Sequence, residues 1–376
     1  MRRCCGFVLC VIAAAGWMAA SETPERIFSQ AMALQRAGDL DGAIREYREF
    51  LKLEPRQGLV HSNLGAVLAK AGRYEEAVSE YRDALKFSPG NPAVSLNLAL
   101  AYYKMGRFTQ AAEQLAAVHR ADPSNAQATE LLADCYLQLG KNKQVVELLE
   151  PVAAKNPDSL DVAYLLGTAL IRDNRVEEGQ VLVDRILRNG DSAEARLLMG
   201  MTKMTALDFA GARGDLEKAA VLNPKLPDVY SYYGFALMST GDTPAAAVAY
   251  RKELETNPND FNANLYMGVL EKQDENFDEA LKHFQRALEL RPGDIGVRYQ
   301  IATVDAATGK TERARVELES MLKEAPQFTE AHVTLATIYY RLKRKEDGDR
   351  ERALVQKLNA AAQTKQPGVK TVGVEK

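Results

Sequence analysis

Residues 58–91 read GLVHSNLGAVLAKAGRYEEAVSEYRDALKFSPGN, and the stretch that follows, residues 92–125, repeats their plan. In the first copy the recurring places hold Leu64, Gly65, Leu68, Gly72, Tyr74, Ala77, Tyr81, Ala84 and Pro89. In the second copy they hold Leu98, Ala99, Tyr102, Gly106, Phe108, Ala111, Leu115 and Pro123. A fixed period of this length indicates a repeat array, in which each unit buries its apolar face against its neighbours.

Prolines set the register of the whole array. They recur with this same period in two series, one in each half of the chain: Pro55, Pro89, Pro123 and Pro157, then Pro224, Pro258, Pro292 and Pro326. The interval between the two series holds two units, one of them shorter by a single residue. Ten units therefore begin near Pro24, Gly58, Pro92, Ala126, Leu160, Ala193, Pro227, Phe261, Ile295 and Thr329. The eighth place of every unit, which did not set this register, is Gly or Ala.

Each recurring place has a physical role in a pair of helices. A small residue at the eighth place lets the first helix of a unit approach the second closely. Large apolar residues such as Leu64 and Leu68 recur at helical spacing. Glycine at the fifteenth place ends the first helix, because a helix C-terminus favours a left-handed residue. Asn174, which tolerates that conformation, stands there in the fifth unit, and the other departures are Leu207, Glu275 and Lys343.

The joint recurrence of small, aromatic and proline places resembles the tetratricopeptide repeat family over residues 24–342. The resemblance implies an all-α fold, a right-handed superhelical α-solenoid of about ten helix-turn-helix units. Residues 343–362 then predict a polar capping helix, and residues 363–376 a disordered tail. The shortened unit near Asn189 is either a kink or a one-residue loop deletion.

The N-terminus has the pattern of a targeting segment. Two arginines are followed by an apolar run, residues 4–20, which ends in small residues before a polar stretch. We interpret residues 1–21 as a cleaved signal peptide, so the protein is predicted to be exported, either periplasmic or secreted. The alternative is a membrane anchor formed by the uncleaved segment. Three of the four cysteines lie in this segment, and the remaining Cys135 is predicted to be a buried small hydrophobe.

Candidate catalytic features are lacking in the sequence. His61 and His332 share the fourth place of distant units, while His119 and His283 lie on second helices, and no two histidines have the spacing of a helical metal site. The sequence contains no phosphate-binding loop, dinucleotide glycine pattern or nucleophilic serine elbow. We therefore predict no enzyme activity, cofactor, metal or small-molecule substrate. A formal net charge of -3 without a basic stripe also argues against nucleic acid.

The resemblance implies a concave groove lined by places two, five, nine, twelve and thirteen of each unit. Large apolar residues at these places predict a binding surface for protein segments or peptides. The candidates are Leu96, Leu100, Tyr103, Tyr164, Met201, Met204, Phe235 and Met238, with Asn63 and Asn97 at the sixth place as partners for a peptide backbone. The alternative is that several of these residues pack between neighbouring helices.

These observations predict a non-catalytic protein–protein interaction scaffold outside the cytoplasm, which binds protein segments in its groove for assembly, transport or envelope maintenance. The alternative is a regulatory or adaptor subunit of a separate enzyme such as a transferase or protease.

Overall fold

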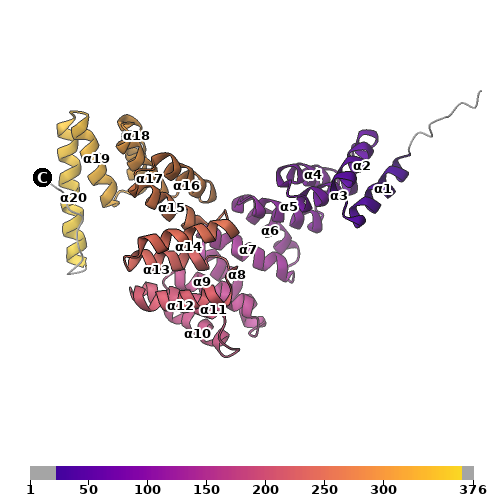
Figure 1. Cartoon of the computed structure of the whole chain (residues 1–376), viewed down its shortest axis with the longest axis horizontal. Helices are drawn as coiled ribbons and strands as arrows, with labels where there is room; N and C mark the ends of the chain where they lie inside the picture. The colour runs from indigo at the N-terminus through magenta and orange to yellow at the C-terminus, as the bar shows by residue number, and fades with distance from the viewer. Residues whose placement is uncertain (1–22, 366–376) are drawn as a thin grey trace, which may run out of the picture. The chain divides into compact units, whose positions relative to one another are not determined.

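The computed structural model describes residues 23–365, which contain 20 α-helices and no strand. The predicted signal peptide and most of the predicted tail lie outside these residues. Contacts divide the chain into two compact units, residues 1–97 and 98–376, with the division inside α5 (Figure 1). The first unit holds the start of α5 (Pro92–Lys104) and, before it, α1 (Pro24–Ala37), α2 (Leu40–Leu53), α3 (Gly58–Lys70) and α4 (Tyr74–Phe87).

The second unit holds the rest of α5 and the remaining helices. They are α6 (Phe108–Ala121), α7 (Ala126–Gln138), α8 (Asn142–Lys155), α9 (Leu160–Arg172), α10 (Val176–Leu187), α11 (Ala193–Thr205), α12 (Phe209–Leu222), α13 (Val229–Ser239), α14 (Thr243–Thr256), α15 (Phe261–Gln273), α16 (Phe277–Leu290), α17 (Ile295–Ala307), α18 (Thr311–Glu324), α19 (Thr329–Arg341) and α20 (Lys345–Lys365). Successive helices pair as hairpins, so the predicted all-α repeat fold is confirmed.

The first helices of the units follow the register that the prolines predict. Nine of the ten begin at the predicted residue, and the exception is α13, which begins at Val229 rather than at Pro227. Asp228 causes this difference, because it adopts a left-handed conformation (φ 66°) directly before the helix. A non-glycine residue in this conformation is uncommon and often marks a functional or strained position.

The residue at the fifteenth place adopts the left-handed backbone conformation in all ten units, including the four in which it is not glycine. Asn174, Leu207, Glu275 and Lys343 have φ between 60° and 62°, close to the values of the glycines at the same place. The left-handed conformation costs an L-residue about 1–2 kcal/mol. Packing of the hairpin therefore imposes the turn even where the sequence departs from the repeat.

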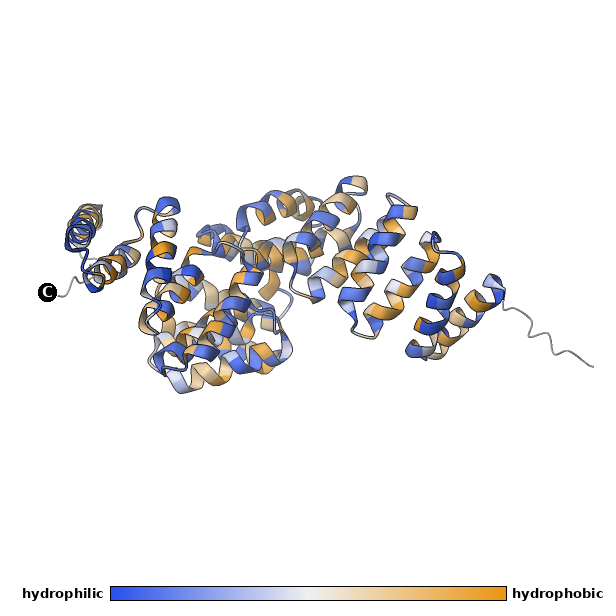
Figure 2. Cartoon of the chain, turned by 90° about the horizontal axis from the view of Figure 1, so that it is seen from above, coloured by the Kyte–Doolittle hydropathy of each residue, from blue (hydrophilic) through white to orange (hydrophobic). Residues whose placement is uncertain are grey.

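The eighth place is where the two helices of a hairpin touch. At Gly268 on α15, an added Cβ would lie 2.5 Å from the Phe284 ring on α16, and the ring is fully buried. Apolar and polar residues alternate along the helices (Figure 2), and the apolar ones form the cores between them. Cys135 is fully buried as predicted, while the other cysteines lie outside the described residues.

Gly268→Ala is expected to lower the free energy of unfolding by about 1–3 kcal/mol, because the new methyl group overlaps the Phe284 ring. Gly214→Ala on α12 is the control, since no atom lies within 4 Å of its Cβ position and the residue is exposed. There alanine should stabilise the helix by about 0.5–1 kcal/mol. Urea unfolding followed by circular dichroism measures both. Equal responses would contradict close contact at the eighth place.

The array ends in α20, which packs against α19 through the fully buried Val355. This helix extends to Lys365, a little beyond the end of the predicted capping helix. Within residues 23–365, no helix combines the length and the apolar character that crossing a lipid bilayer requires.

Candidate functional site

The predicted groove residues are covered to different degrees. Met201 is 3% exposed and belongs to the apolar core of the second unit, so it offers little surface to a partner. The other nine are half-buried: Leu96, Leu100, Tyr103, Tyr164, Met204, Phe235, Met238, Asn63 and Asn97. Half-buried apolar residues can pack against neighbouring helices and still present a face to a bound segment.

In the first unit, Asn63 lines a pocket of about 380 Å³ together with Met32, Ala66 and Lys70. These residues come from α1 and α3, the first helices of two adjacent repeats. Leu96 and Asn97 lie on α5, at the end of this unit.

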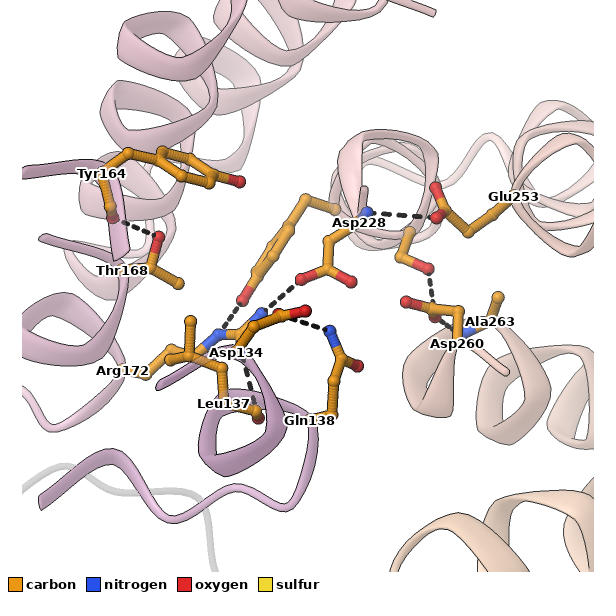
Figure 3. A network of polar contacts seen from close by, with 12 residues as sticks. Asp134, Leu137, Gln138, Tyr164, Thr168, Arg172, Asp228, Glu253, Asp260 and Ala263 are labelled. Atoms are coloured by element: carbon orange, nitrogen blue, oxygen red, sulfur yellow. Dashed lines mark hydrogen bonds and ion pairs between the residues drawn. The ribbon is translucent and has the colours of Figure 1, made fainter. Parts of the chain in front are cut away.

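In the second unit, a network of polar side chains crosses the face that the first helices form (Figure 3). Its centre is Arg172, the last residue of α9. The Arg172 guanidinium donates to Asp228 Oδ2 at 2.7 Å, to the Tyr232 hydroxyl at 2.7 Å and to the Leu137 carbonyl at 3.3 Å. The residues joined in this way lie up to 60 positions apart in the sequence.

Two more carboxylates, Glu253 and Asp260, adjoin Asp228. Glu253 accepts hydrogen bonds from the backbone N–H groups of Asp228 and Tyr230 at 3.1 and 3.0 Å. Asp260 accepts from the Ser231 hydroxyl and the Ala263 N–H, both at 2.6 Å. Oxygen atoms of the three carboxylates lie within 4.8 Å of one another, a spacing that could suit a cation. Both oxygens of Glu253, Asp228 Oδ2 and Asp260 Oδ1 already accept from N–H, O–H or guanidinium donors, so we describe the cluster as a hydrogen-bond network.

Burial controls the protonation of this cluster. It raises the pKa of Glu253 to about 7, with the Asp228 charge as the next cause, and it raises the pKa of Asp260 well above its usual value. Burial alone would raise the pKa of Asp228 as well, but the Arg172 guanidinium, a hydrogen bond with Asp260 and the charge of Arg291 together outweigh it, and the pKa falls. Asp228 is thus the ionised partner of Arg172, while its two neighbours hold protons more firmly than ordinary carboxyl groups.

Contacts between distant repeats of the second unit hold the same region together. Arg291 Nε donates to the Gln138 carbonyl at 2.6 Å, and Asn259 Nδ2 donates to the Lys104 carbonyl at 3.2 Å. Arg286 donates to the Met105 carbonyl at 3.0 Å, across 181 positions of sequence. Within this unit the curvature of the array therefore brings the C-terminal part of α16 and the turn before α15 into contact with the C-terminal ends of α5 and α7.

Two pockets flank the Arg172–Asp228 ion pair. The first, the leucine–acid pocket, encloses about 520 Å³ and is lined by residues that include Leu100, Leu131, Leu165, Glu130, Asp134 and Asp228, with Tyr164 beside them. The second, the arginine pocket, encloses about 320 Å³ and is lined by residues that include Arg172, Arg291, Asn142, Met204, Phe235 and Tyr266. The structure thus brings predicted groove residues together in pairs, Leu100 with Tyr164 and Met204 with Phe235.

Tyr103 and Met238 belong to the same unit but are not among the lining residues of these two pockets. The Tyr103 hydroxyl donates a hydrogen bond to Asp134, and its ring packs edge-on against Phe108 with centroids 5.3 Å apart. Met238 packs against the core around Tyr250.

The charged members of the network were not among the residues that the sequence singled out. Asp134, Arg172 and Asp228 occupy places nine, thirteen and two of their repeats, three of the places expected to face the groove. A charged residue at such a place is a usable signal. That these particular residues meet could not be predicted, because the curvature of the array brings them together.

The histidines contribute to packing. His61 and His332 make the same two contacts in distant repeats: Nδ1 contacts a glutamate, Glu80 or Glu351, and Nε2 contacts the carbonyl of the proline that precedes the helix. Each ring thus joins the first helix of its repeat to the second helix. The shared fourth place is a structural position.

The helical hairpins, their left-handed turns and their inner face define an α-solenoid of the repeat class. Two family models, both for the tetratricopeptide repeat, match residues 28–92, 68–135, 106–154, 136–202, 234–295 and 272–332. These matches cover most of the chain, so the chain belongs to the tetratricopeptide repeat family.

Among curated proteins, the chain is similar to anaphase-promoting complex subunit 3 of Schizosaccharomyces pombe (strain 972 / ATCC 24843), with 22% identity over 151 residues. The match covers 40% of this chain and 23% of that protein, so the chain spans less than a quarter of this relative's length.

Two solved structures resemble the fold. The crystal structure of the APC/C hetero-tetramer Cut9-Hcn1 matches with a TM-score of 0.57 and 13% identity, over 93% of this chain and 88% of that one. The crystal structure of MamA protein matches with a TM-score of 0.42 and 20% identity, over 44% of this chain and 91% of that one.

Proposed function

We propose that this protein is a non-catalytic scaffold that binds a segment of a partner protein along the inner face of its second unit. The observation that carries the proposal is the pair of half-open pockets on either side of the Arg172–Asp228 ion pair. The ion pair and its hydrogen bonds fix the spacing between the pockets, so an incoming segment meets a formed surface. A preformed surface loses less conformational freedom on binding than a flexible one.

The lining of the leucine–acid pocket indicates the kind of segment. Leucines form its apolar walls, and three acidic residues line the same space. No cation lies within ion-pair distance of Glu130 or Asp134 in the described part of the chain. A lysine or arginine side chain fits this lining, because its methylene stem can pack on leucine while its charged end meets the carboxylates. The proposed occupant is therefore an extended segment with a basic side chain.

Short random peptides displayed on phage and selected against the purified chain test this proposal. Selected peptides are expected to share a lysine or arginine. Their affinity, measured by fluorescence polarisation, should fall at least tenfold in Glu130→Lys, which places a positive charge at the pocket.

Glu113→Lys is the matched control, because Glu113 is exposed on the second helix α6 and its charge change is the same. Selection of peptides without a basic residue, or equal affinities for Glu130→Lys and the wild type, would contradict the proposal.

Export from the cytoplasm belongs to the same proposal. It rests on the charge and hydropathy pattern of residues 1–21, which lie outside the described residues. Placement outside the cytoplasm would make partner proteins of the envelope or of the secretory route available to the inner face. The scaffold would then act in their assembly, transport or maintenance.

A further inference from the structure

The arginine pocket carries an excess of positive charge. Arg172 and Arg291 line it, and none of its lining residues is acidic. Arg172 already pairs with Asp228. Arg291 has no carboxylate within ion-pair distance among the described residues: its Nε donates to the Gln138 carbonyl, and its guanidinium lies 3.9 Å from the centre of the Phe261 ring. The charges of Asp228 and Asp294 act on Arg291 only from beyond ion-pair distance. A buried charge with no carboxylate in direct contact is costly, and an anion in the pocket would lower that cost.

Burial also acts on Arg291 itself. It lowers the pKa of the guanidinium, and the nearby charge of Arg172 adds to this effect. An arginine stays protonated in proteins, so the fall reports an unfavourable environment for the charge rather than its loss. Among the described residues, Arg291 donates a hydrogen bond only through its Nε, to the Gln138 carbonyl, so its terminal nitrogens can donate to an oxygen that enters the pocket.

Asn142 supplies a second, independent sign of a missing partner. Its Oδ1 atom is buried and accepts no hydrogen bond from any residue in the described part of the chain. Buried polar atoms almost always have a partner, and each one that lacks it requires an explanation. Since Asn142 lines the same pocket as the two arginines, a small rotation of its amide would let an N–H or O–H group of a bound molecule satisfy this oxygen.

Apolar and aromatic side chains form most of the remaining lining, and Ser231 and Asn262 are its other polar members. Phe235 and Tyr266 pack with ring centroids 5.1 Å apart, and Met204 lines the pocket beside them. The pocket therefore combines guanidinium donors, one unsatisfied acceptor and aromatic walls within about 320 Å³. A bound amino-acid residue with a large apolar or aromatic side chain, a carboxylate and an amide N–H would match these three features of the pocket.

We propose that the arginine pocket binds a carboxylate attached to an apolar or aromatic residue, with Arg291 as the principal anion-binding side chain. The carboxylate accepts from the guanidinium, the adjacent amide N–H donates to Asn142, and the side chain packs on Phe235 and Tyr266. The proposal rests on the proposed function, since it names the second group that a bound segment would present. The carboxylate belongs either to the end of a chain or to an acidic side chain.

N-acetyl-L-phenylalanine is the probe, and its amide, which lacks the carboxylate, is the matched comparison. We expect ligand-observed NMR titration of the purified chain to give an affinity of about millimolar for the acid, as suits so small a molecule. The amide should bind at least tenfold more weakly. N-acetyl-Phe-Glu-amide distinguishes the sources: tight binding of this probe assigns the site to an acidic side chain, and weak binding assigns it to a chain end.

Arg291→Gln should weaken binding of the acid at least tenfold, while Arg251→Gln, an exposed arginine on α14, should leave it unchanged. If Arg291→Gln fails to fold by circular dichroism, Asn142→Asp replaces it, because a new carboxylate in the pocket should abolish binding of the acid. Equal affinities for the acid and its amide, or an unchanged affinity in a folded Arg291→Gln protein, overturn the proposal.

The two proposals can fail separately. If peptide binding depends on Glu130 but the affinity for N-acetyl-L-phenylalanine is unchanged in Arg291→Gln, only the proposal for the arginine pocket is refuted. Probe binding that depends on Arg291, without any basic peptide from the selection, refutes the scaffold proposal and leaves a carboxylate site.

Discussion

Arg172→Ala is expected to lower the free energy of unfolding of the second unit by about 3–5 kcal/mol, the cost of leaving a buried charge without its partner. The side chains of Arg172 and Asp228 are 14% and 11% exposed, and their atoms lie 2.7 Å apart. Without the guanidinium, Asp228 would face Glu253 and Asp260 with no ion-pair partner in contact. The variant also loses the hydrogen bonds to Tyr232 and to the Leu137 carbonyl.

Arg175→Ala is the control for this prediction. Arg175 lies in the turn after α9, and it pairs with Glu150 and Glu178 at the surface, where such ion pairs contribute about 0–1 kcal/mol. Urea unfolding followed by circular dichroism compares the two variants with the wild type. A loss of stability in Arg172→Ala no larger than in Arg175→Ala would show that the ion pair does not support the fold.

A double variant separates the ion pair from the other contacts of Arg172. Asp228→Asn keeps a side chain that tolerates the left-handed conformation and removes the charge. Arg172→Ala combined with Asp228→Asn should therefore cost less than the sum of the two single changes, because no unpaired charge remains. Simple additivity would assign the loss to packing and to the hydrogen bonds alone.

The fold was predictable because its determinants are local and repeated. A proline at the end of eight of the ten units, a small residue at the eighth place and a left-handed residue at the fifteenth place each act within one hairpin. The structure of one unit, once interpreted correctly, therefore predicts that of the others. The sequence alone would have cast doubt on the turns at Leu207 and Glu275, yet their backbone matches that of the glycines. The late start of α13 is a departure that the repeat could not predict, and it falls at Asp228, inside the polar network.

The site was predictable in part, for a physical reason. Which faces of the helices turn inward follows from the repeat, and this placed Leu100, Tyr164, Met204 and Phe235 beside the two pockets. Which inward-facing residues come into contact depends on the angles between successive repeats. Small differences in packing set each angle, and the angles add up along the array. The contact of Arg291 with Gln138, which are 153 positions apart in the sequence, depends on this accumulated angle. Selecting the apolar residues alone also left out the charged ones that give the inner face its chemistry.

The second unit is expected to be more stable at pH 5 than at pH 8, and Glu253 is the main reason. Its carboxyl group has a pKa of about 7 in the folded protein against an ordinary value of 4.5. Between these values the folded state binds more protons than the unfolded state, so the free energy of unfolding falls as the pH rises. The loss from this group is at most about 3 kcal/mol and is complete above pH 7. Asp260, with its raised pKa, acts in the same direction.

Glu253→Gln isolates this contribution, because glutamine cannot ionise. The variant loses some stability at pH 5, where it replaces a hydrogen-bonded carboxyl group, but its stability should vary less with pH than that of the wild type. Urea unfolding at several pH values between 5 and 8 measures the difference, with the exposed Glu255→Gln on α14 as the control. A constant difference between Glu253→Gln and the wild type across this range would mean that Glu253 does not titrate there. A carboxyl group that keeps one protonation state from pH 5 to pH 8 has its pKa outside this range, and any change of stability with pH would then have to come from other groups such as Asp260.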